Sequence, residues 1–279
     1  MIVVVSIYII DSDYEILFFI LNNMSFDGKV VIVTGASSGI GAATAIKFAA
    51  EGAKVCLVGR NQTKLNNVAE KCRKPLVLVA DVSNDEDAAK IINDTVKHFG
   101  KLDILVNNAG IGHTVSILEK TSVAMDVFDR VMATNLRAPV LLTNLAIPHL
   151  IKTKGNIVNI SSIAALNVIS KQYFSYCASK AALDHFTRSV ALELAASGVR
   201  VNTVNPGPVY TDIIENNGTA ADNVEATFDL LKTITALNRV STADEVADVI
   251  LFLASDKAIA ITGSSYVTDN GTLIKGMIP

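Results

Sequence analysis

The sequence predicts an α/β domain in which a parallel sheet carries helices on both of its faces. Short β-branched segments alternate with helical segments about six times along the chain. A glycine-rich turn, residues 35–41, follows the first predicted strand and precedes a helix. The polar and glycine-rich motifs fall at or just after predicted strand ends, which is where open parallel sheets bind ligands.

Length and composition agree with one domain. The chain has 279 residues, and no linker or charge block divides it. Its net charge of −3 gives no indication of nucleic-acid binding. Three widely spaced cysteines, Cys56, Cys72 and Cys177, form no metal or disulfide pattern. We therefore expect no metal site, buried thiols and a reducing, cytoplasmic compartment.

Residues 1–24 are predicted to be an extension outside the core fold, which would occupy residues 25–279. Two apolar runs, residues 2–10 and 16–21, are separated by a segment with three acidic residues. Neither run is long enough to span a bilayer, and no basic region marks a signal peptide. The extension could reflect an upstream start site, add a surface strand or helix, or associate with a membrane.

The first unit has a strand at residues 29–34, a glycine turn and a helix at residues 42–51. Gly35 allows the tight turn, Gly39 permits close approach of a phosphate, and Gly41 lets the helix pack on the strand. The helix N-terminus offers free N–H groups to a pyrophosphate. The spacing G-x-x-x-G-x-G differs from the usual dinucleotide fingerprint, but its place between strand and helix indicates nucleotide binding.

The second strand, residues 54–59, is followed by Arg60 with no acid nearby in the sequence. A guanidinium at this position suits a 2′-phosphate, so we expect NADP rather than NAD. A helix is expected over residues 61–73 and a strand over residues 76–80. Asp81, after that strand, could border an adenine ring or cap the following turn.

A helix over residues 85–99 leads to a fourth strand at residues 102–106. Residues 107–110 follow this strand. Their small side chains leave room for a cofactor, and Asn107 or Asn108 can join strand ends by hydrogen bonds. One long helix is expected over residues 123–150, bent near Pro139. Asn135 lies in its middle, where a polar amide often bends a helix or meets water.

A fifth strand, residues 154–160, precedes two serines and a helix that ends near residue 197. Tyr176 and Lys180 lie one turn apart on this helix, on the same face. The lysine ammonium should favour the phenolate and lower the pKa of the tyrosine. The pair would then act as a general acid/base near neutral pH.

The last third contains a sixth strand at residues 199–204, an irregular loop and a final strand at residues 265–268. Residues 213–240 are polar and are expected to form a mobile lid with short helices. The helix over residues 242–254 should begin with a capping box, in which Thr242 and Glu245 bond each other's backbone.

Residues 25–279 resemble the classical short-chain dehydrogenase/reductase family. The resemblance rests on a set of motifs in a specific order: Thr34 to Gly41, Asn107 to Gly110, Asn135, Ser162, Tyr176-x-x-x-Lys180, Pro206-Gly207, and Ile261-Thr-Gly263 with Asp269-x-Gly271. It implies a three-layer, doubly wound Rossmann fold with a seven-stranded, mostly parallel sheet. It also implies reversible hydride transfer between a nicotinamide cofactor and a small-molecule carbonyl or alcohol, in a homotetramer or homodimer that pairs the Asn135 and Tyr176 helices.

Residue by residue, the resemblance implies that Tyr176 is the acid/base and that Ser162 bonds the substrate oxygen. Lys180 would bind the nicotinamide ribose, and Asn135 would hold a water linked to Lys180. The implied cofactor-binding residues are Gly35, Ser37, Ser38, Gly39, Ile40, Gly41, Arg60, Asn61, Asp81, Val82, Asn108, Ala109, Gly110, Tyr176, Lys180, Pro206, Gly207, Val209 and Thr211.

The sequence also departs from the family pattern. Ser162 precedes Tyr176 by 14 residues where the family usually has 13, and Ser161 lies one residue further away. Tyr173 is a rival tyrosine, but Cys177 stands where its lysine would be. Asn270 replaces a glycine often found near the end. A non-catalytic dinucleotide-binding redox sensor on the same fold is the alternative function, although it would need only the glycine turn and strand-end residues.

Overall fold

The computed structural model describes residues 24–211 and 224–276. The extension at residues 1–23 and the first part of the expected lid, residues 213–223, lie outside this range. Within it, one sheet of seven strands has the order β3-β2-β1-β4-β5-β6-β7, and every pairing is parallel. The expected doubly wound sheet is therefore confirmed, and it is all-parallel.

The strands are short and mostly buried, as expected for a parallel sheet covered on both faces. Their bounds are β1 Val30–Thr34, β2 Lys54–Gly59, β3 Leu76–Val79, β4 Ile104–Asn107, β5 Asn156–Ile160, β6 Arg200–Pro206 and β7 Ser265–Thr268. The order reverses between β1 and β4, because the chain returns to pair β4 with β1 after building β2 and β3. Such a switch point opens a crevice at the carboxyl ends of the strands.

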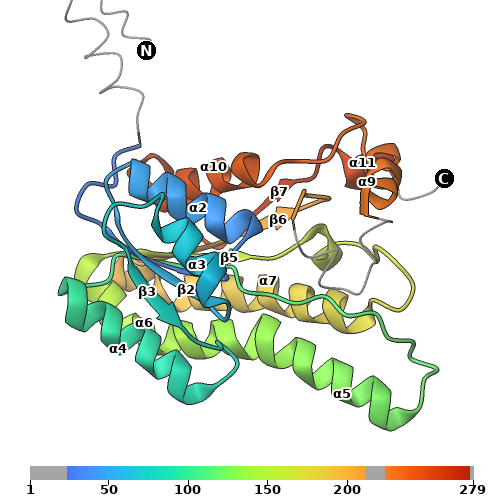
Figure 1. The fold of residues 1–279 in the computed structure, drawn as a ribbon, viewed down its shortest axis with the longest axis horizontal. Coiled ribbons are helices and arrows are strands. Elements are labelled where there is room, and N and C mark those ends of the chain that lie inside the picture. The colour runs from blue at the N-terminus through green and yellow to red at the C-terminus, as the bar shows by residue number, and fades with distance from the viewer. Residues whose placement is uncertain (1–23, 212–223, 277–279) are drawn as a thin grey trace, which may run out of the picture.

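Helices lie on both faces of the sheet (Figure 1). One layer contains α2 (Gly39–Ala50), α3 (Gln62–Ala69) and α10 (Ala243–Ala254); the other contains α4 (Asp85–Phe99), α5 (Thr121–Met132), α6 (Ala138–Thr153) and α7 (Phe174–Leu194). The short helices α9 (Val224–Thr233) and α11 (Thr272–Lys275) lie near the C-terminus.

Alternate residues of β1 enter the two halves of the core. Val31 and Val33 pack in the cluster that contains Phe48 of α2 and Ile250 of α10. Val30 and Ile32 pack in the cluster on the other face, with Ile91 of α4 and Leu142 of α6. This alternation follows from the two-residue period of a strand.

Three helix predictions differ from the structure. The helix expected over residues 61–73 ends at Ala69. The long helix expected over residues 123–150 is interrupted by a π-helical turn at Ala133–Arg137, rather than bent near Pro139. Pro139 lies in the first turn of α6, where a missing N–H is tolerated. The Tyr176 helix stops at Leu194, and a 3₁₀ turn covers Ala195–Ser197.

One local prediction is confirmed, and one departure from the family pattern is explained. Thr242 and Glu245 form the expected capping box at the start of α10. Asn270, which stands where a glycine was expected, adopts a left-handed conformation (φ 51°) that asparagine tolerates better than most residues. Its side-chain amide donates to Ser241 Oγ at 2.8 Å, which anchors the turn after β7.

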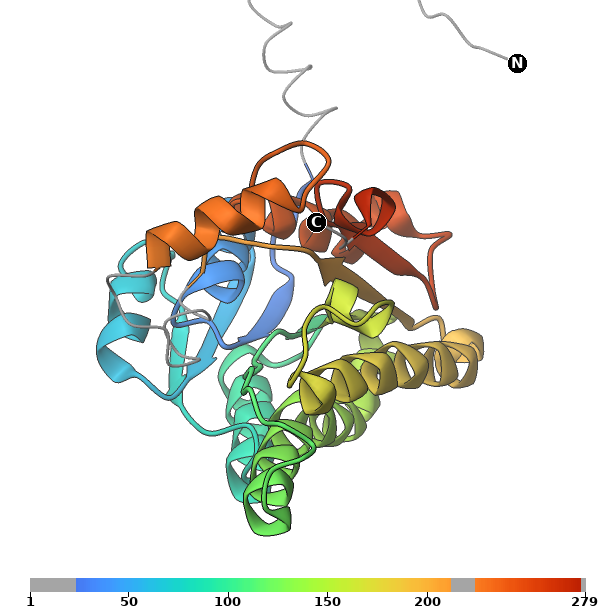
Figure 2. The same ribbon diagram turned by 90° about the vertical axis from the view of Figure 1, so that its right-hand side faces the viewer.

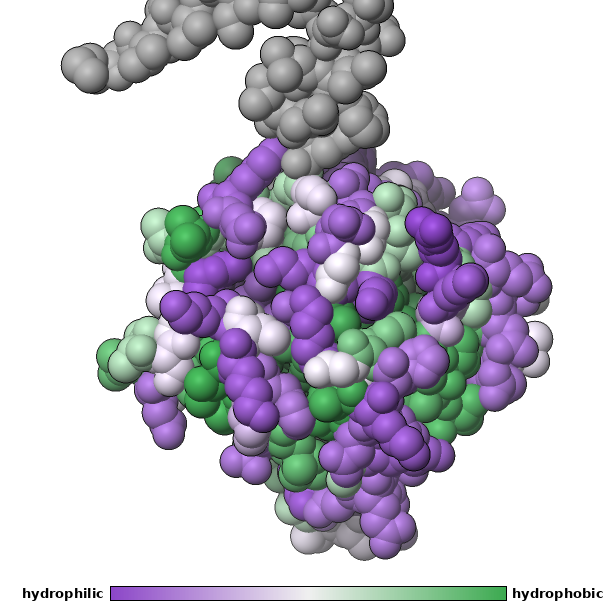
Figure 3. Space-filling view, turned by 90° about the vertical axis from the view of Figure 1, so that its left-hand side faces the viewer, coloured by the Kyte–Doolittle hydropathy of each residue, from purple (hydrophilic) through white to green (hydrophobic). Residues whose placement is uncertain are grey.

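The two ends of the sheet differ. The connections that follow the carboxyl ends of the strands face the viewer in Figure 2. The opposite face is mainly hydrophilic, with hydrophobic residues in small groups between the polar ones (Figure 3). In the described residues, no helix is long and apolar enough to cross a bilayer.

Candidate active site

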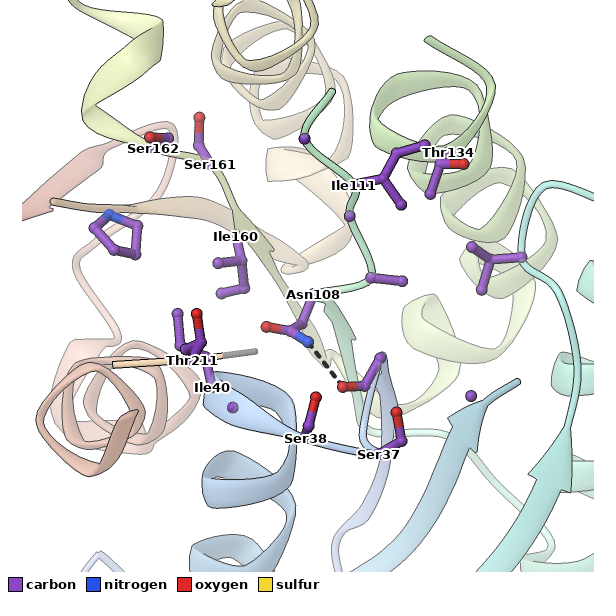
Figure 4. A pocket seen from close by; sticks show the side chains of 18 of the residues that line it. Ser37, Ser38, Ile40, Asn108, Ile111, Thr134, Ile160, Ser161, Ser162 and Thr211 are labelled. Carbon is purple, nitrogen blue, oxygen red and sulfur yellow. Dashed lines mark hydrogen bonds between the residues drawn. The ribbon is translucent and has the colours of Figure 1, made fainter. Parts of the chain in front are cut away.

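A cleft of about 440 Å³ lies at the carboxyl ends of the strands. It is lined by nearly all the residues predicted to form the site, and Figure 4 shows several of them around it. Three predicted residues do not line it directly: Gly41, Asn61 and Asn135. Gly41 and Asn135 support the cleft from behind. Asn61 instead caps α3, where its Oδ1 accepts from Lys64 N at 3.0 Å.

The glycine turn forms the floor of the cleft through its backbone. Gly35 and Gly39 have φ of +66° and +54°, which side chains disfavour. A Cβ at Gly41 would overlap the carbonyl oxygen of Gly35 and the side chain of Asn108, so α2 can approach the turn only with glycine there. A Cβ at Gly39 would lie 2.9 Å from Cγ2 of Thr211 rather than fill open space.

The N-terminus of α2 opens into this cleft. Ser38 is its N-cap residue, but the Ser38 side chain makes no capping hydrogen bond, and the first turn contains no acidic residue. Free N–H groups and the positive end of the helix dipole are the features that bind a pyrophosphate. The glycine turn therefore fits a dinucleotide by its backbone geometry.

Asn107, the last residue of β4, and Asn108, which follows it, both tie strand ends together. Asn107 Nδ2 donates to Asn159 Oδ1 at 2.8 Å and so joins β4 to β5. Asn108 Nδ2 donates to Thr34 O at 2.9 Å, and its weaker bond to Gly35 O reaches the glycine turn (Figure 4). Asn107 is buried behind the cleft, while Asn108 lines it, so the two neighbours have different roles.

Arg60 and Asp81 meet beside the cleft, where β2 and β3 end. No acid is near Arg60 in the sequence, but in the structure Asp81 Oδ2 lies 3.7 Å from Arg60 Nη1. Asp81 also accepts from the backbone N and the Oγ of Ser83, so it caps the following turn while lining the cleft. Partial burial opposes its ionisation, but the Ser83 hydrogen bonds and the Arg60 charge hold the pKa of Asp81 below its usual value.

Tyr176, Ser162 and Lys180 come together on the opposite wall. The Tyr176 side chain forms a hydrogen bond with Ser162, and Lys180 Nζ lies 5.7 Å from the centre of the Tyr176 ring. Lys180 is buried and donates to the carbonyl oxygen of Ile160 at 2.8 Å. Ser162 Oγ accepts from Ala164 N, whereas Ser161 Oγ turns to the carbonyl oxygen of Lys180. Of the two serines, Ser162 is therefore the one that bonds Tyr176.

Burial controls the titration of this pair. It raises the pKa of Tyr176 to about 12, and the Ser162 hydrogen bond offsets only part of that shift. Burial also lowers the pKa of Lys180 to about 8, against the opposing charge of Asp184. The prediction that Lys180 lowers the pKa of Tyr176 is thus not met here, because the same environment disfavours both charges.

Asn135 supports the cleft from the π-helical turn. Its Oδ1 accepts from Ile111 N and its Nδ2 donates to Ile111 O, both at 2.8 Å. Nδ2 also donates to Ser179 Oγ at 3.2 Å. These bonds engage the side-chain amide in positioning the backbone after Gly110. Because these hydrogen bonds use both Oδ1 and Nδ2, the side-chain amide has little capacity left to bind the water that the resemblance assigns to Asn135.

The cleft also contains residues that the sequence did not single out. Thr134, Gly112 and His113 line it, and the Ile160 carbonyl holds Lys180. Each lies next to a predicted motif along the chain. Their place in the cleft depends on how the strand ends converge, which motif spacing does not describe.

Comparison with known proteins identifies the family. A family model described as enoyl-(acyl carrier protein) reductase matches residues 35–272. The chain belongs to the short-chain dehydrogenase/reductase family. Family membership and the named dehydrogenase and reductase relatives imply an oxidoreductase with a nicotinamide dinucleotide cofactor.

Relatives cover most of the chain. Meso-2,3-butanediol dehydrogenase of Serratia marcescens is 36% identical over 250 residues, which is 89% of this chain and 96% of that protein. L-xylulose reductase of Caenorhabditis elegans is 38% identical over 258 residues, 89% of this chain and 97% of that protein. A crystal structure of a short-chain dehydrogenase/reductase of unknown function from C. elegans, determined with cofactor, has a TM-score of 0.84 at 36% identity and covers 89% of this chain and 96% of its own.

Proposed function

We propose that this protein interconverts a carbonyl and an alcohol, with Tyr176 as the general acid/base and NADP as the preferred cofactor. The observation that carries the proposal is the Tyr176 side chain bonded to Ser162 in the cleft beyond the glycine turn, with buried Lys180 beside it. A carbonyl oxygen between these two hydroxyls could accept two hydrogen bonds. That would polarise the carbonyl and hold it for proton transfer.

The residues of this chain fit a dinucleotide. The glycine turn and the N-terminus of α2 would hold the pyrophosphate, while Lys180 and Thr211 would contact the nicotinamide half. When bound, a reduced nicotinamide supplies a hydride. The protein must then supply one proton and a fixed position for the substrate.

In the reduction, the carbonyl carbon gains the hydride and the carbonyl oxygen gains the proton of Tyr176. The tyrosinate regains a proton from water, so one hydride and one proton are consumed for each carbonyl. A pKa near 12 keeps the phenol protonated at neutral pH, which suits the donor of that proton. The Lys180 ammonium beside the ring would stabilise the negative charge left on the oxygen.

The preference for NADP rests on Arg60. Its side chain is 71% exposed at the rim of the cleft, directly after β2, where it could bind a 2′-phosphate. Asp81 moderates this charge from 3.7 Å away. A phosphate dianion offers the guanidinium a stronger partner than one carboxylate, so it should displace that contact.

The assembly is also part of the proposal: a homodimer or homotetramer that pairs the helices carrying Asn135 and Tyr176. Val123 and Met125 on α5 are each 46% exposed, and Leu192 on α7 is 82% exposed. Apolar side chains on these helices would be covered by a second copy. Light scattering should therefore give a mass of two or four chains, and a monomer would contradict this part.

Replacing Tyr176 by Phe tests the chemistry. Tyr176→Phe should lower kcat about 10²–10⁴-fold because the proton donor is lost, while the Kd for NADPH stays within about twofold. Stopped-flow absorbance and fluorescence titration measure these quantities. The matched control is Tyr173→Phe, which removes the hydroxyl of the neighbouring tyrosine, whose ring centroid lies 5.8 Å away. Equal turnover in Tyr176→Phe and wild type would refute the assignment, and NADPH binding without any turnover would favour the redox sensor.

A further inference from the structure

One polar side chain in the cleft has no role in the proposed chemistry. His113 lies in the connection between β4 and α5 and lines the same cleft as Ser162, Tyr176 and Lys180. It is only partly exposed. Among residues 24–211 and 224–276, its imidazole makes no hydrogen bond or ion pair. A half-buried imidazole without a partner can still donate one hydrogen bond and accept another.

The backbone on both sides of His113 is held in place. Two residues before it, both backbone polar groups of Ile111 bond the Asn135 side chain at 2.8 Å. Two residues after it, Val115 N donates to Gln172 O at 2.9 Å, and the Val115 side chain is buried beside Phe174 and Val127. The loop therefore presents His113 to the cleft from a fixed backbone, as a binding residue requires.

The polar side chains on the Tyr176 wall of the cleft are engaged in hydrogen bonds. Ser162 and Tyr176 bond each other where the reacting oxygen would bind, and Lys180 bonds Ile160. Ser161 Oγ donates to the Lys180 carbonyl. Ile111 and Gly112, the two residues before the histidine, have no polar side-chain atoms. A second oxygen on a substrate would thus need a partner other than the catalytic pair, and the imidazole of His113 can be that partner.

We propose that His113 binds a hydroxyl group on the carbon next to the reacting carbon, so that the substrates are α-hydroxy ketones and the vicinal diols formed from them. This inference rests on the proposed function. The names of two relatives support the substrate class: 2,3-butanediol carries hydroxyls on adjacent carbons, and xylulose carries a hydroxyl beside its ketone. In the reduction, the hydroxyl bound by His113 stays unchanged while the neighbouring carbonyl gains a hydride and a proton.

Matched pairs of ketones test the proposal on the full chain. In each pair only the adjacent hydroxyl differs: 3-hydroxybutan-2-one against butan-2-one, and 2-hydroxycyclohexanone against cyclohexanone. With saturating NADPH, the measured quantity is the ratio of kcat/KM between the hydroxylated and plain ketone. The wild type should prefer the hydroxylated ketone by about tenfold or more, the value of one good hydrogen bond.

Three variants separate His113 from its surroundings. His113→Phe keeps an aromatic ring without hydrogen-bonding atoms and should bring the ratio close to one. His113→Gln keeps a donor and an acceptor and should recover part of the preference. Thr114→Val, on the exposed neighbour that does not line the cleft, is the matched control and should leave the ratio as it is in the wild type.

Distinct outcomes would overturn the inference or the function beneath it. A wild-type ratio near one, or a ratio unchanged in His113→Phe, would overturn the role of His113 and leave the proposed function standing. Loss of the preference in Thr134→Val but not in His113→Phe would assign the hydroxyl to the other polar residue of that wall. No turnover of any ketone would refute the proposed function and the inference with it.

Discussion

The two walls of the cleft are built in different ways. The wall at the glycine turn works through its backbone: two glycines with positive φ, a third glycine in close contact, and the free N–H groups of α2. The wall at α7 works through buried side chains, and Lys180 and Ser162 hold their positions by bonds to Ile160 and Ala164. A backbone wall tolerates almost no added atom, whereas a side-chain wall carries buried charge at a cost in stability.

Tertiary contacts also differ between the walls. The residues that build the glycine turn are consecutive in the chain, although Asn108 and Thr211 also lie against it. Behind the α7 wall, Asn205 Nδ2 donates to Asp184 Oδ2 at 2.8 Å and to Ser162 O at 3.1 Å, which links β6 to α7 and to the segment after β5. The difference shows why the first wall can be recognised from a few consecutive residues and the second only from residues far apart in sequence.

The largest expected effect is on the backbone wall. Gly41→Ala should lower the free energy of unfolding by about 3 kcal/mol, because the added methyl group overlaps the Gly35 carbonyl oxygen and the backbone must move. Urea denaturation measures this. Gly100→Ala is the control: Gly100 has φ +84° and open space, so only about 1 kcal/mol of conformational strain is expected. Equal losses in both variants would mean that the backbone wall is not sterically tight.

An effect of similar size, but dependent on pH, concerns the buried charge of the side-chain wall. Lys180→Met should abolish turnover yet remove a charge that burial destabilises. The folded pKa of Lys180 is about 8 against 10.5 for the free side chain, so the unfolded chain binds more protons between those pH values. The free-energy cost of burying the Lys180 ammonium is fully present below pH 8 and vanishes as the pH rises to 10.5.

The stability difference between Lys180→Met and wild type should therefore change by about 3 kcal/mol across that range, in favour of the wild type at high pH. Urea melts at intervals between pH 7 and 10.5 measure it. Lys97→Met, on the exposed surface of α4, controls for replacing a lysine by methionine. A difference that is flat with pH would show that Lys180 carries no buried charge and would remove the contrast between the walls.

The smallest effect tests whether the glycine-turn wall also uses side chains. Arg60→Ala should raise the KM for NADPH about tenfold and that for NADH little, because only the 2′-phosphate needs the guanidinium. Asp81→Asn removes the carboxylate at 3.7 Å and should lower the KM for NADPH a few-fold. Steady-state kinetics measures the KM for each cofactor in both variants. Equal changes in the KM for NADPH and the KM for NADH would refute the preference for NADP.

Sequence reasoning succeeded where the cause is local. The strands, the glycine turn, the capping box of Thr242 and the tie made by Asn107 depend on residue types and spacing, and the structure has them as expected. It failed where the cause is tertiary. Asp81 is far from Arg60 in sequence but adjacent across β2 and β3. Burial, which dominates the pKa of Tyr176, depends on packing that helical spacing cannot describe.

Some predictions stay open for experiment. The extension at residues 1–23, its membrane association and the cytoplasmic location lie outside the described structure and the comparisons. The roles of Tyr176, Ser162, Lys180 and Asn135 are proposals that the kinetic variants address. For Asn135, the bonds to Ile111 indicate that its variants would act through the loop that carries His113.

The π-helical turn at Ala133–Arg137 has a consequence for how this chain could change by insertion or deletion. Such a turn contains one residue more than an α-helical turn. Deleting one residue there would close the wide turn to a regular α-helical turn, and α5 and α6 would keep nearly the same phase, because the wide turn absorbs the extra residue locally. Leu142 and Ala146 would then still face the core, whereas Asn135, which lies within the turn, would no longer point at Ile111. The extra residue thus sets the position of the Asn135 side chain and not the packing of α6.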